Sequence, residues 1–260
     1  MVFYDANLSY GTEFNVSRTP PLPCRTIAEL DDALERAGVT GGLVRTLAAD
    51  MSGVVVGNRM LADDLKTVRA DLYGMYTLVP RYTNELPSPE DLPGVLKAWK
   101  MPVLRMNPRT HRFLPKAGVL REYLGMAADL KIPVMLDTTC GITLDECYDL
   151  LCAYPTLTAI LAYSNIWPAD RYYRPFLSQF PNLRMELSSM ITDQGIEDLV
   201  RVYGAQRLLF GSRFPSMYIG GQQLMLRCAE ISDADKKLIA GENLRNMIAA
   251  GVSADAEVLK

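Results

Sequence analysis

The chain has 260 residues, of which 49% are hydrophobic and 22% charged, a composition typical of a packed globular protein. Its net charge of −3, with no basic tract, argues against nucleic acid or an anionic membrane as the main partner. No apolar stretch approaches the ~18 residues of a membrane-spanning helix, so a membrane-embedded protein is not expected.

Short apolar, β-rich segments alternate with amphipathic segments along most of the chain. Ile27, Leu30 and Leu34 share one face of the first amphipathic segment, which is helical spacing. Thr143-Leu-Asp-Glu146 has the form of a capping box and predicts another helix start. Strands are predicted at 2–8, 42–47, 73–79, 102–107, 133–138, 158–163, 183–188 and 207–211. Helices are predicted at 26–37, 58–69, 89–99, 116–130, 143–154, 171–180, 191–203 and 232–250.

Strict alternation of strands and helices implies parallel strands joined by right-handed crossovers. Eight such units within a chain of this length favour a closed (β/α)₈ TIM barrel, of the α/β class, over an open doubly wound sheet. No G-x-G-x-x-G follows the first strand, so the usual dinucleotide-binding signal of the rival fold is missing. No linker or low-complexity tract divides the sequence. We therefore expect one domain spanning residues 1–260.

Five cysteines are spread along the chain without a C-x-x-C pair. This spacing argues against a disulfide framework and against zinc or thioredoxin-like motifs, and it predicts reduced thiols in a cytoplasmic protein. An apolar strand begins almost at Met1, so no amino-terminal signal peptide is expected.

Several segments, in this order, resemble the amidohydrolase-related family of metal-dependent TIM-barrel hydrolases and decarboxylases. Asp5-Ala-Asn7-Leu-Ser9 occupies the frame of the family's first-strand D-x-H-x-H, and Pro133-Val-Met-Leu-Asp137 that of its fifth-strand P-V-x-x-H. Ile160-Leu-Ala-Tyr163 matches the sixth strand. Phe210-Gly-Ser-Arg213-Phe-Pro215 matches the end of the eighth strand, where the family has F-G-S-D-F-P. The resemblance spans almost the whole chain and implies the same barrel, with hydrolase or lyase ancestry.

The positions that bind the metal in the family are all substituted here. They are Asn7, Ser9, Asp137, Tyr163 and Arg213. A zinc-like ion needs about three imidazole or carboxylate ligands from the protein, whereas a guanidinium keeps its positive charge at any relevant pH. The chain has a single histidine, His111, which supplies at most one ligand. We therefore expect no metal and no other cofactor.

The resemblance also predicts which side chains line the barrel mouth, since active sites of TIM barrels lie at the carboxyl ends of the strands. Substrate-binding positions are predicted at Asn7, Ser9, Arg105, Asn107, Asn165 and Glu186, with Arg45 on the same rim. Arginines suit a small anionic or carboxylated molecule. In the alternative interpretation, Arg213 fills the metal space and pairs with Asp137 while Arg105 pairs with Glu186, so that the mouth is plugged by internal ion pairs.

Two functional classes remain open. In the first, the chain is a non-catalytic or weakly active homologue that binds a small anionic metabolite. In the second, it is a metal-independent hydrolase or lyase on a small carboxylated substrate, with Asp137, Tyr163 and Arg213 as catalytic residues.

Weaker candidates for chemistry and association complete the sequence predictions. Cys140 is a weaker nucleophile candidate, because a buried thiol is the more usual role of cysteine. His111 is expected on a surface loop. A homodimer is predicted, with exposed aromatic residues near 167–176 as its interface.

Overall fold

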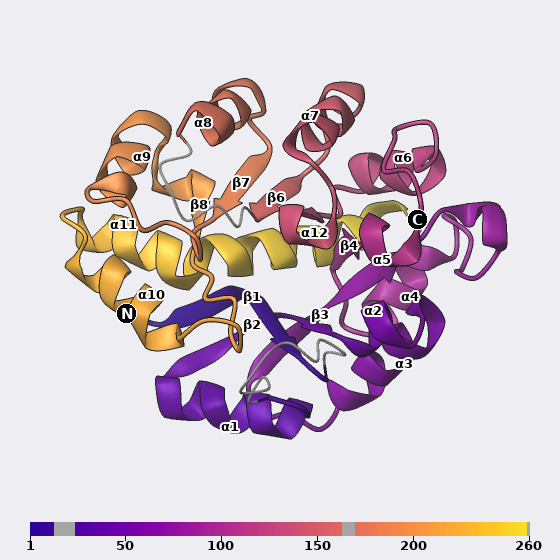
Figure 1. Ribbon diagram of the computed structural model, residues 1–260, viewed down its shortest axis with the longest axis horizontal. Helices are drawn as coiled ribbons and strands as arrows, with labels where there is room; N and C mark the ends of the chain where they lie inside the picture. The colour runs from indigo at the N-terminus through magenta and orange to yellow at the C-terminus, as the bar shows by residue number, and fades with distance from the viewer. Residues whose placement is uncertain (13–23, 163–169, 259–260) are drawn as a thin grey trace.

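The computed structural model describes residues 1–12, 24–162 and 170–258, and within them the expected (β/α)₈ TIM barrel is confirmed. All eight strands are parallel and are hydrogen-bonded in sequence order (Figure 1). The strands are β1 (Phe3–Tyr10), β2 (Val39–Thr46), β3 (Asp71–Leu78), β4 (Val103–Met106), β5 (Val134–Asp137), β6 (Ala159–Ala162), β7 (Leu183–Glu186) and β8 (Leu208–Leu209). The amides of Ala6 and Ser9 donate to the carbonyls of Phe210 and Phe214, at 2.9 and 3.0 Å, and so join the first strand to the last.

Helices follow the strands in turn, and most of them cover the outside of the barrel (Figure 1). They are α1 (Ile27–Ala37), α2 (Ala48–Met51), α3 (Val54–Asp64), α4 (Leu92–Ala98), α5 (Pro108–His111), α6 (Arg121–Asp129), α7 (Leu144–Ala153), α8 (Asp170–Gln179), α9 (Gly195–Tyr203), α10 (Ile219–Cys228), α11 (Asp233–Lys237) and α12 (Asn243–Val258). The capping box predicted at Thr143 and Glu146 is present. None of the helices in the described ranges is long and apolar enough to cross a membrane.

The helices differ from the sequence prediction in four places. Helix α10 was not predicted, because its sequence IGGQQLMLRC has two glycines in its first turn and buries two glutamines, which hides the amphipathic pattern. The short helices α2 and α5 lie in loops directly after β2 and β4. The expected single helix at 232–250 is interrupted by a five-residue π-helical segment, Leu238–Glu242, between α11 and α12. The loops after β2 and β4 are therefore more ordered than expected.

The interior of the barrel is a separate apolar cluster that α12 closes at the amino-terminal end of the strands. Leu244 and Ile248 of α12 are buried against inward-facing residues, and the Arg245 guanidinium stacks over the Tyr4 ring. The inward-facing members are Tyr4, Ala6, Leu43, Met75, Val103, Met135, Ile160, Ala162 and Leu209. Because this end is packed, the opposite end is the one left for a ligand.

A bulge in β1 sets which side chains face inward. The pairing with β2 advances three residues in β1, from Asp5 to Leu8, but only two in β2. Tyr4 and Ala6 therefore belong to the interior cluster, whereas Leu8 and Tyr10 pack with the helices outside. By the same alternation Ser9 lies on the inner side, at the carboxyl end of the strand.

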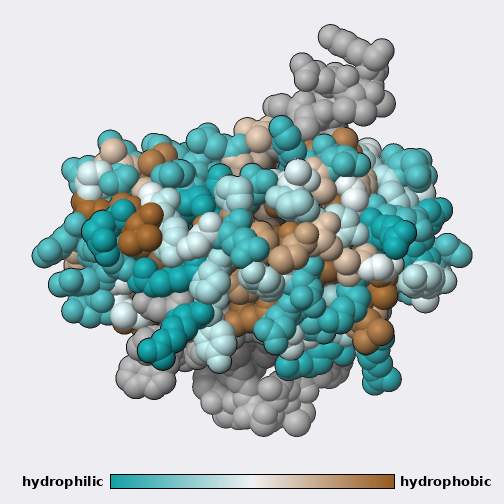
Figure 2. Space-filling model, turned by 90° about the horizontal axis from the view of Figure 1, so that it is seen from above, coloured by the Kyte–Doolittle hydropathy of each residue, from teal (hydrophilic) through white to brown (hydrophobic). Residues whose placement is uncertain are grey.

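The surface seen from the side of α7 and α8 is largely hydrophilic, with apolar residues in separate areas (Figure 2). Tyr172 of α8 is exposed, but Tyr173 and Phe176 are buried in the core. Trp167 lies outside the described residues. Fewer aromatic side chains of α8 are therefore exposed than the predicted interface requires, and the homodimer stays a prediction.

Truncating Leu244 tests the role of α12 in closing the barrel. Leu244→Ala should lower the free energy of unfolding by about 2–4 kcal/mol, because the side chain is buried and its removal leaves a cavity. Leu224→Ala on α10, where the side chain is 61% exposed, is the control and should change stability by less than about 0.5 kcal/mol. Urea unfolding of both variants measures the difference; equal values would show that α12 does not support the core.

Candidate ligand-binding site at the barrel mouth

Along the strands, the side chains that point into the barrel are mostly apolar, but at the carboxyl ends of the strands they are polar. Four of these polar residues lie two positions after an interior apolar residue of the same strand: Arg45, Thr77, Arg105 and Asp137. The fifth, Glu186, lies two positions after Arg184. Apart from Asp137, these side chains belong to two networks, one on β2 to β5 and one on β7, β8 and β1.

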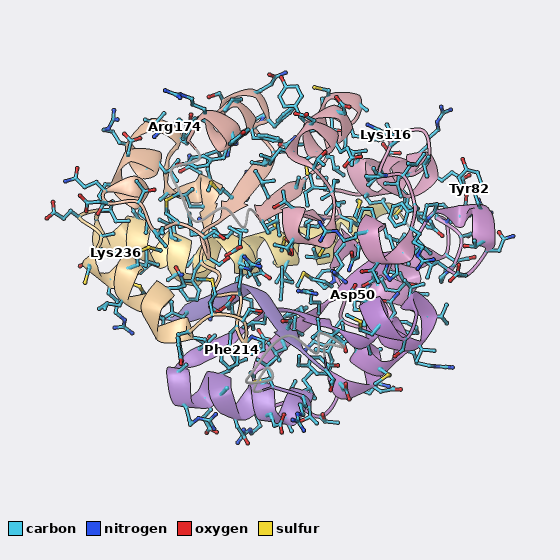
Figure 3. The ribbon with its side chains drawn as sticks, in the orientation of Figure 1. Asp50, Tyr82, Lys116, Arg174, Phe214 and Lys236 are labelled. Carbon is cyan, nitrogen blue, oxygen red and sulfur yellow. The ribbon has the colours of Figure 1, made fainter. Side chains whose placement is uncertain are left out.

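The first network centres on Asp50 of α2, which lies inside the ring of helices (Figure 3). The Asp50 carboxylate accepts from Arg45 at 3.0 Å and from Arg105 at 2.9 Å. Burial alone would raise the pKa of Asp50, but the two guanidinium groups outweigh it and hold the pKa below its usual value. We call Arg45, Asp50 and Arg105 the arginine cluster; its formal charge is positive.

The two arginines of the cluster have different freedom. Arg105 is 2% exposed and also donates to the Thr77 hydroxyl at 3.0 Å and to the Cys140 thiol at 3.3 Å. Its hydrogen-bonding capacity is therefore largely used within the protein. The Arg45 side chain is 19% exposed, and its Nε is buried without a hydrogen-bond partner. Arg45 is the member of the cluster that has donors left for a ligand.

The loop after β4 supports the arginine cluster. Asn107 caps α5 by accepting from the Thr110 amide. His111, at the end of α5, forms a hydrogen bond of 3.0 Å between its Nε2 and the carbonyl oxygen of Ala49, the residue before Asp50. Since a carbonyl only accepts, Nε2 carries the proton in this bond. The His111 ring is half-buried rather than fully exposed, and its hydrogen bond connects α5 to α2.

The second network contains two buried carboxyl groups, Asp5 and Glu186. Glu186 accepts from the Asn7 amide at 3.0 Å and from the Ser188 hydroxyl at 2.8 Å. Burial raises the pKa of Glu186 to about 7 and that of Asp5 to about 6. Asp5 Oδ1 accepts from the backbone amides of Asn7 and Ser212, whereas Asp5 Oδ2 is buried without a partner. We call Asp5 and Glu186 the carboxyl pair.

Gly211 is required beside the carboxyl pair. A Cβ at this position would lie 2.0 Å from Glu186 Oε1, so no larger residue fits while Glu186 keeps its place. The glycine of the Phe210-Gly-Ser segment therefore allows the end of β8 to pass directly over the carboxyl group.

The ion pairs expected for a plugged mouth do not form. Arg105 pairs with Asp50, not with Glu186, because the loop after β2 brings a carboxylate that the sequence prediction did not consider. Asp137 accepts from the amide and hydroxyl of Thr139, at 2.9 and 2.6 Å, and no ion pair joins it to Arg213. Arg213 itself is half-buried with a positive φ of 56°.

The remaining predicted positions are only partly described. Asn7, Ser9, Asn107 and Asp137 are buried at the strand ends. Tyr163 and Asn165 lie outside the described residues. Asp5, Asp50 and Thr77 were not among the predicted site residues. Asp50 carries a usable sequence signal, because Leu-Ala-Ala-Asp50 follows directly after the polar end of β2.

The donor set does not fit the divalent metal that the family resemblance implies. Within the described ranges, no three histidine, cysteine or acidic residues are grouped closely enough to bind one ion. Both oxygens of Glu186 already accept hydrogen bonds, which leaves Asp5 Oδ2 as the free acceptor of the carboxyl pair. A structural or catalytic ion needs about three such ligands. No chemical step is therefore assigned to a metal here.

The comparisons with known proteins support the fold. No family model and no curated protein matches the sequence. Among solved structures, 2,6-dihydroxybenzoate decarboxylase complexed with 2,6-dihydroxybenzoate aligns with a TM-score of 0.73 at 14% identity, covering 96% of this chain and 99% of that one. A dihydroxybenzoic acid decarboxylase from Polaromonas sp. JS666, with bound manganese and the inhibitor 2-nitroresorcinol, aligns with a TM-score of 0.72 at 16% identity. The alignment covers 96% of this chain and 97% of that one. 4-Oxalomesaconate hydratase from Rhodopseudomonas palustris aligns with a TM-score of 0.66 at 13% identity, and the alignment covers 100% of both chains. At these identities the likeness shows the barrel fold alone.

The raised pKa of Glu186 predicts a pH-dependent stability. Because the folded protein holds this proton up to about pH 7 whereas an ordinary glutamate releases it near 4.5, stability is lost as the pH rises through this window. Between pH 5 and 8 this effect of Glu186 should lower the free energy of unfolding by about 2–3 kcal/mol. Glu186→Gln should therefore flatten the dependence of the unfolding free energy on pH.

Exposed Glu230 provides the control, since Glu230→Gln should leave the wild-type pH dependence in place. Urea unfolding at several pH values compares the three proteins. Parallel curves for Glu186→Gln and wild type would contradict the burial argument.

Proposed function

We propose that the chain binds a small carboxylated molecule at the barrel mouth without a metal, as a non-catalytic or weakly active homologue of the amidohydrolase-related enzymes. The observation that carries the proposal is Arg45. It is anchored by Asp50, partly exposed, and has a buried Nε with no partner. A carboxylate is the group that matches the free donors of a guanidinium fork.

The charge of the arginine cluster favours the same ligand. One carboxylate, Asp50, faces two guanidinium groups, so a second negative group would balance the charge. The carboxyl pair does not do this, because its hydrogen bonds are to Asn7, Ser188 and backbone amides. In this proposal Arg105 holds Asp50 in place, and Asn7, Ser9, Asn107 and Glu186 line the mouth.

The similar structures support a ligand of this class. One of them holds 2,6-dihydroxybenzoate and another holds the inhibitor 2-nitroresorcinol. Both are small aromatic molecules with polar substituents, and the first carries a carboxylate. The proposal for this chain rests on its own arginines, with these structures as support.

Binding of benzoate and 2,6-dihydroxybenzoate by calorimetry tests the proposal. Arg45→Gln should weaken binding about tenfold or more, which corresponds to the loss of one charge-assisted contact. Arg59→Gln, on the exposed side of α3, is the matched control and should bind as the wild type does. Benzamide, which lacks the negative charge, should not bind. Absence of saturable carboxylate binding to the wild-type protein, or equal binding by Arg45→Gln, would refute the proposal.

A second candidate function is a metal-independent lyase acting on a carboxylated substrate, with Asp137, Tyr163 and Arg213 as its predicted catalytic residues and Glu186 as the proton donor. The observation that favours it is the pKa of Glu186, about 7, because such a carboxyl group exchanges a proton at neutral pH. Loss of carbon dioxide from an arenecarboxylate requires a proton to replace the carboxyl group on carbon.

Release of carbon dioxide from 2,6-dihydroxybenzoate in the presence of a chelator distinguishes this candidate from simple binding. The lyase predicts turnover that falls at least about a hundredfold in Glu186→Gln and Asp137→Asn, in line with the loss of general acid–base catalysis, but not in Glu230→Gln. Saturable binding of this carboxylate without turnover would leave the binding function alone.

A further inference from the structure

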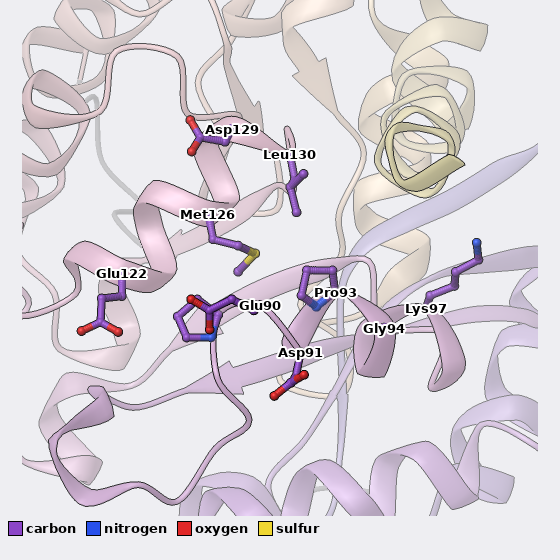
Figure 4. A pocket seen from close by; sticks show the side chains of 10 residues that line it. Glu90, Asp91, Pro93, Gly94, Lys97, Glu122, Met126, Asp129 and Leu130 are labelled. Atoms are coloured by element: carbon purple, nitrogen blue, oxygen red, sulfur yellow. The ribbon is translucent and has the colours of Figure 1, made fainter. Parts of the chain in front are cut away.

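The outer wall of the barrel contains a cavity between α4 and α6 (Figure 4). Its volume is about 730 Å³, and the residues that line it come from the two helices and their adjoining turns rather than from the strands. Ligand sites in proteins typically have volumes of about 300–1,000 Å³. This cavity is therefore of ligand size, and it is separate from the barrel mouth.

The cavity has an apolar floor because of the residues at the facing positions. Met126 extends from α6 toward the α4 side, where Pro93 lies (Figure 4). Leu130 and Pro89 add further apolar surface. Gly94 of α4 provides no side chain, and a Cβ placed there would meet no atom within 4 Å. An occupant with a hydrocarbon body would bury this floor.

The rim of the cavity is acidic. Four carboxylates, Glu90, Asp91, Glu122 and Asp129, line it together with one ammonium group, that of Lys97. Glu122 pairs with Arg81, and Asp91 accepts from the Ser88 hydroxyl. Even with Glu122 neutralised, the lining keeps a negative excess. This charge favours a cationic occupant over a neutral or anionic one.

The position of Asp129 strengthens the case for a cation. It is the last residue of α6, where the helix dipole presents its negative end, and the last turn of α6 has no basic residue. A carboxylate is unfavourable at this position, whereas a positive charge beside it is favourable. A bound cation would interact with Asp129 and with the carbonyl end of the helix at once.

We propose that this cavity binds a small organic cation, an ammonium group carried on an alkyl or aryl body. The hydrocarbon part lies against Met126, Leu130 and Pro93, and the ammonium group lies near Asp129. The site is on the outer wall, so the proposal is independent of carboxylate binding at the mouth.

Hexylammonium is the probe, with its affinity measured by calorimetry on the full chain. Gly94→Leu should weaken binding about tenfold or more, because the added side chain fills the cavity. The substitution is sterically permitted and replaces glycine within a helix, so folding is expected to be maintained. Gly220→Leu is the matched control, since Gly220 is an exposed glycine of α10 that likewise has no atom within 4 Å of a Cβ.

Two further measurements separate charge from apolar contact. Asp129→Asn should weaken hexylammonium binding and reduce its dependence on salt. Hexanol and hexanoate should bind more weakly than hexylammonium. The proposal is overturned if hexylammonium does not saturate the wild-type protein, if hexanol binds equally well, or if Gly94→Leu binds no more weakly than Gly220→Leu.

Discussion

The carboxylate of Asp50 is the constraint on which the candidate site depends. It neutralises Arg105, a guanidinium that is almost fully buried and would be strongly destabilising without an ionic partner. The same carboxylate holds Arg45, while Arg105 reaches Thr77 and Cys140. One short helix after β2 therefore joins the carboxyl ends of β2, β3, β4 and β5. The polar side chains of this half of the mouth are oriented by hydrogen bonds within the protein.

The other half of the mouth has the opposite chemistry. Asp5 and Glu186 are both fully buried, and burial raises the pKa of each. A nearby positive charge would counter this effect, but the main opposing interactions are hydrogen bonds with Asn7, Ser188 and Ser212. The mouth is thus divided into a cationic side on β2 to β5 and a protonatable side on β7 to β1. A ligand with an anionic group and a neutral hydrogen-bonding group matches this division.

The barrel could be predicted from the sequence because each strand and most helices carry their own local pattern. All eight strands were predicted, and each lies close to its predicted range. The partners of the mouth residues could not be predicted in the same way. The link from Asp50 to Arg105 spans 55 residues, and that from Asn7 to Glu186 spans 179. Periodicity predicts the face on which a side chain lies, whereas its hydrogen-bonding partner depends on the loops, as Asp50 on α2 illustrates. The π-helical segment before α12 was likewise not visible in the periodic pattern.

Arg213 shows how a position can be predicted while the contacts of its side chain cannot. The motif match predicts that its guanidinium takes the place of an inorganic cation. A cation in that place would keep the surrounding carboxyl groups ionised, which means that the pKa of Asp5 and Glu186 would be lowered. Instead burial raises the pKa of both carboxyl groups, and no guanidinium is among the principal causes. Its half-buried position and its lack of an ion pair to Asp137 agree with this. The two guanidinium groups that pair with Asp50, those of Arg45 and Arg105, come from other strands, which the motif alignment alone does not predict.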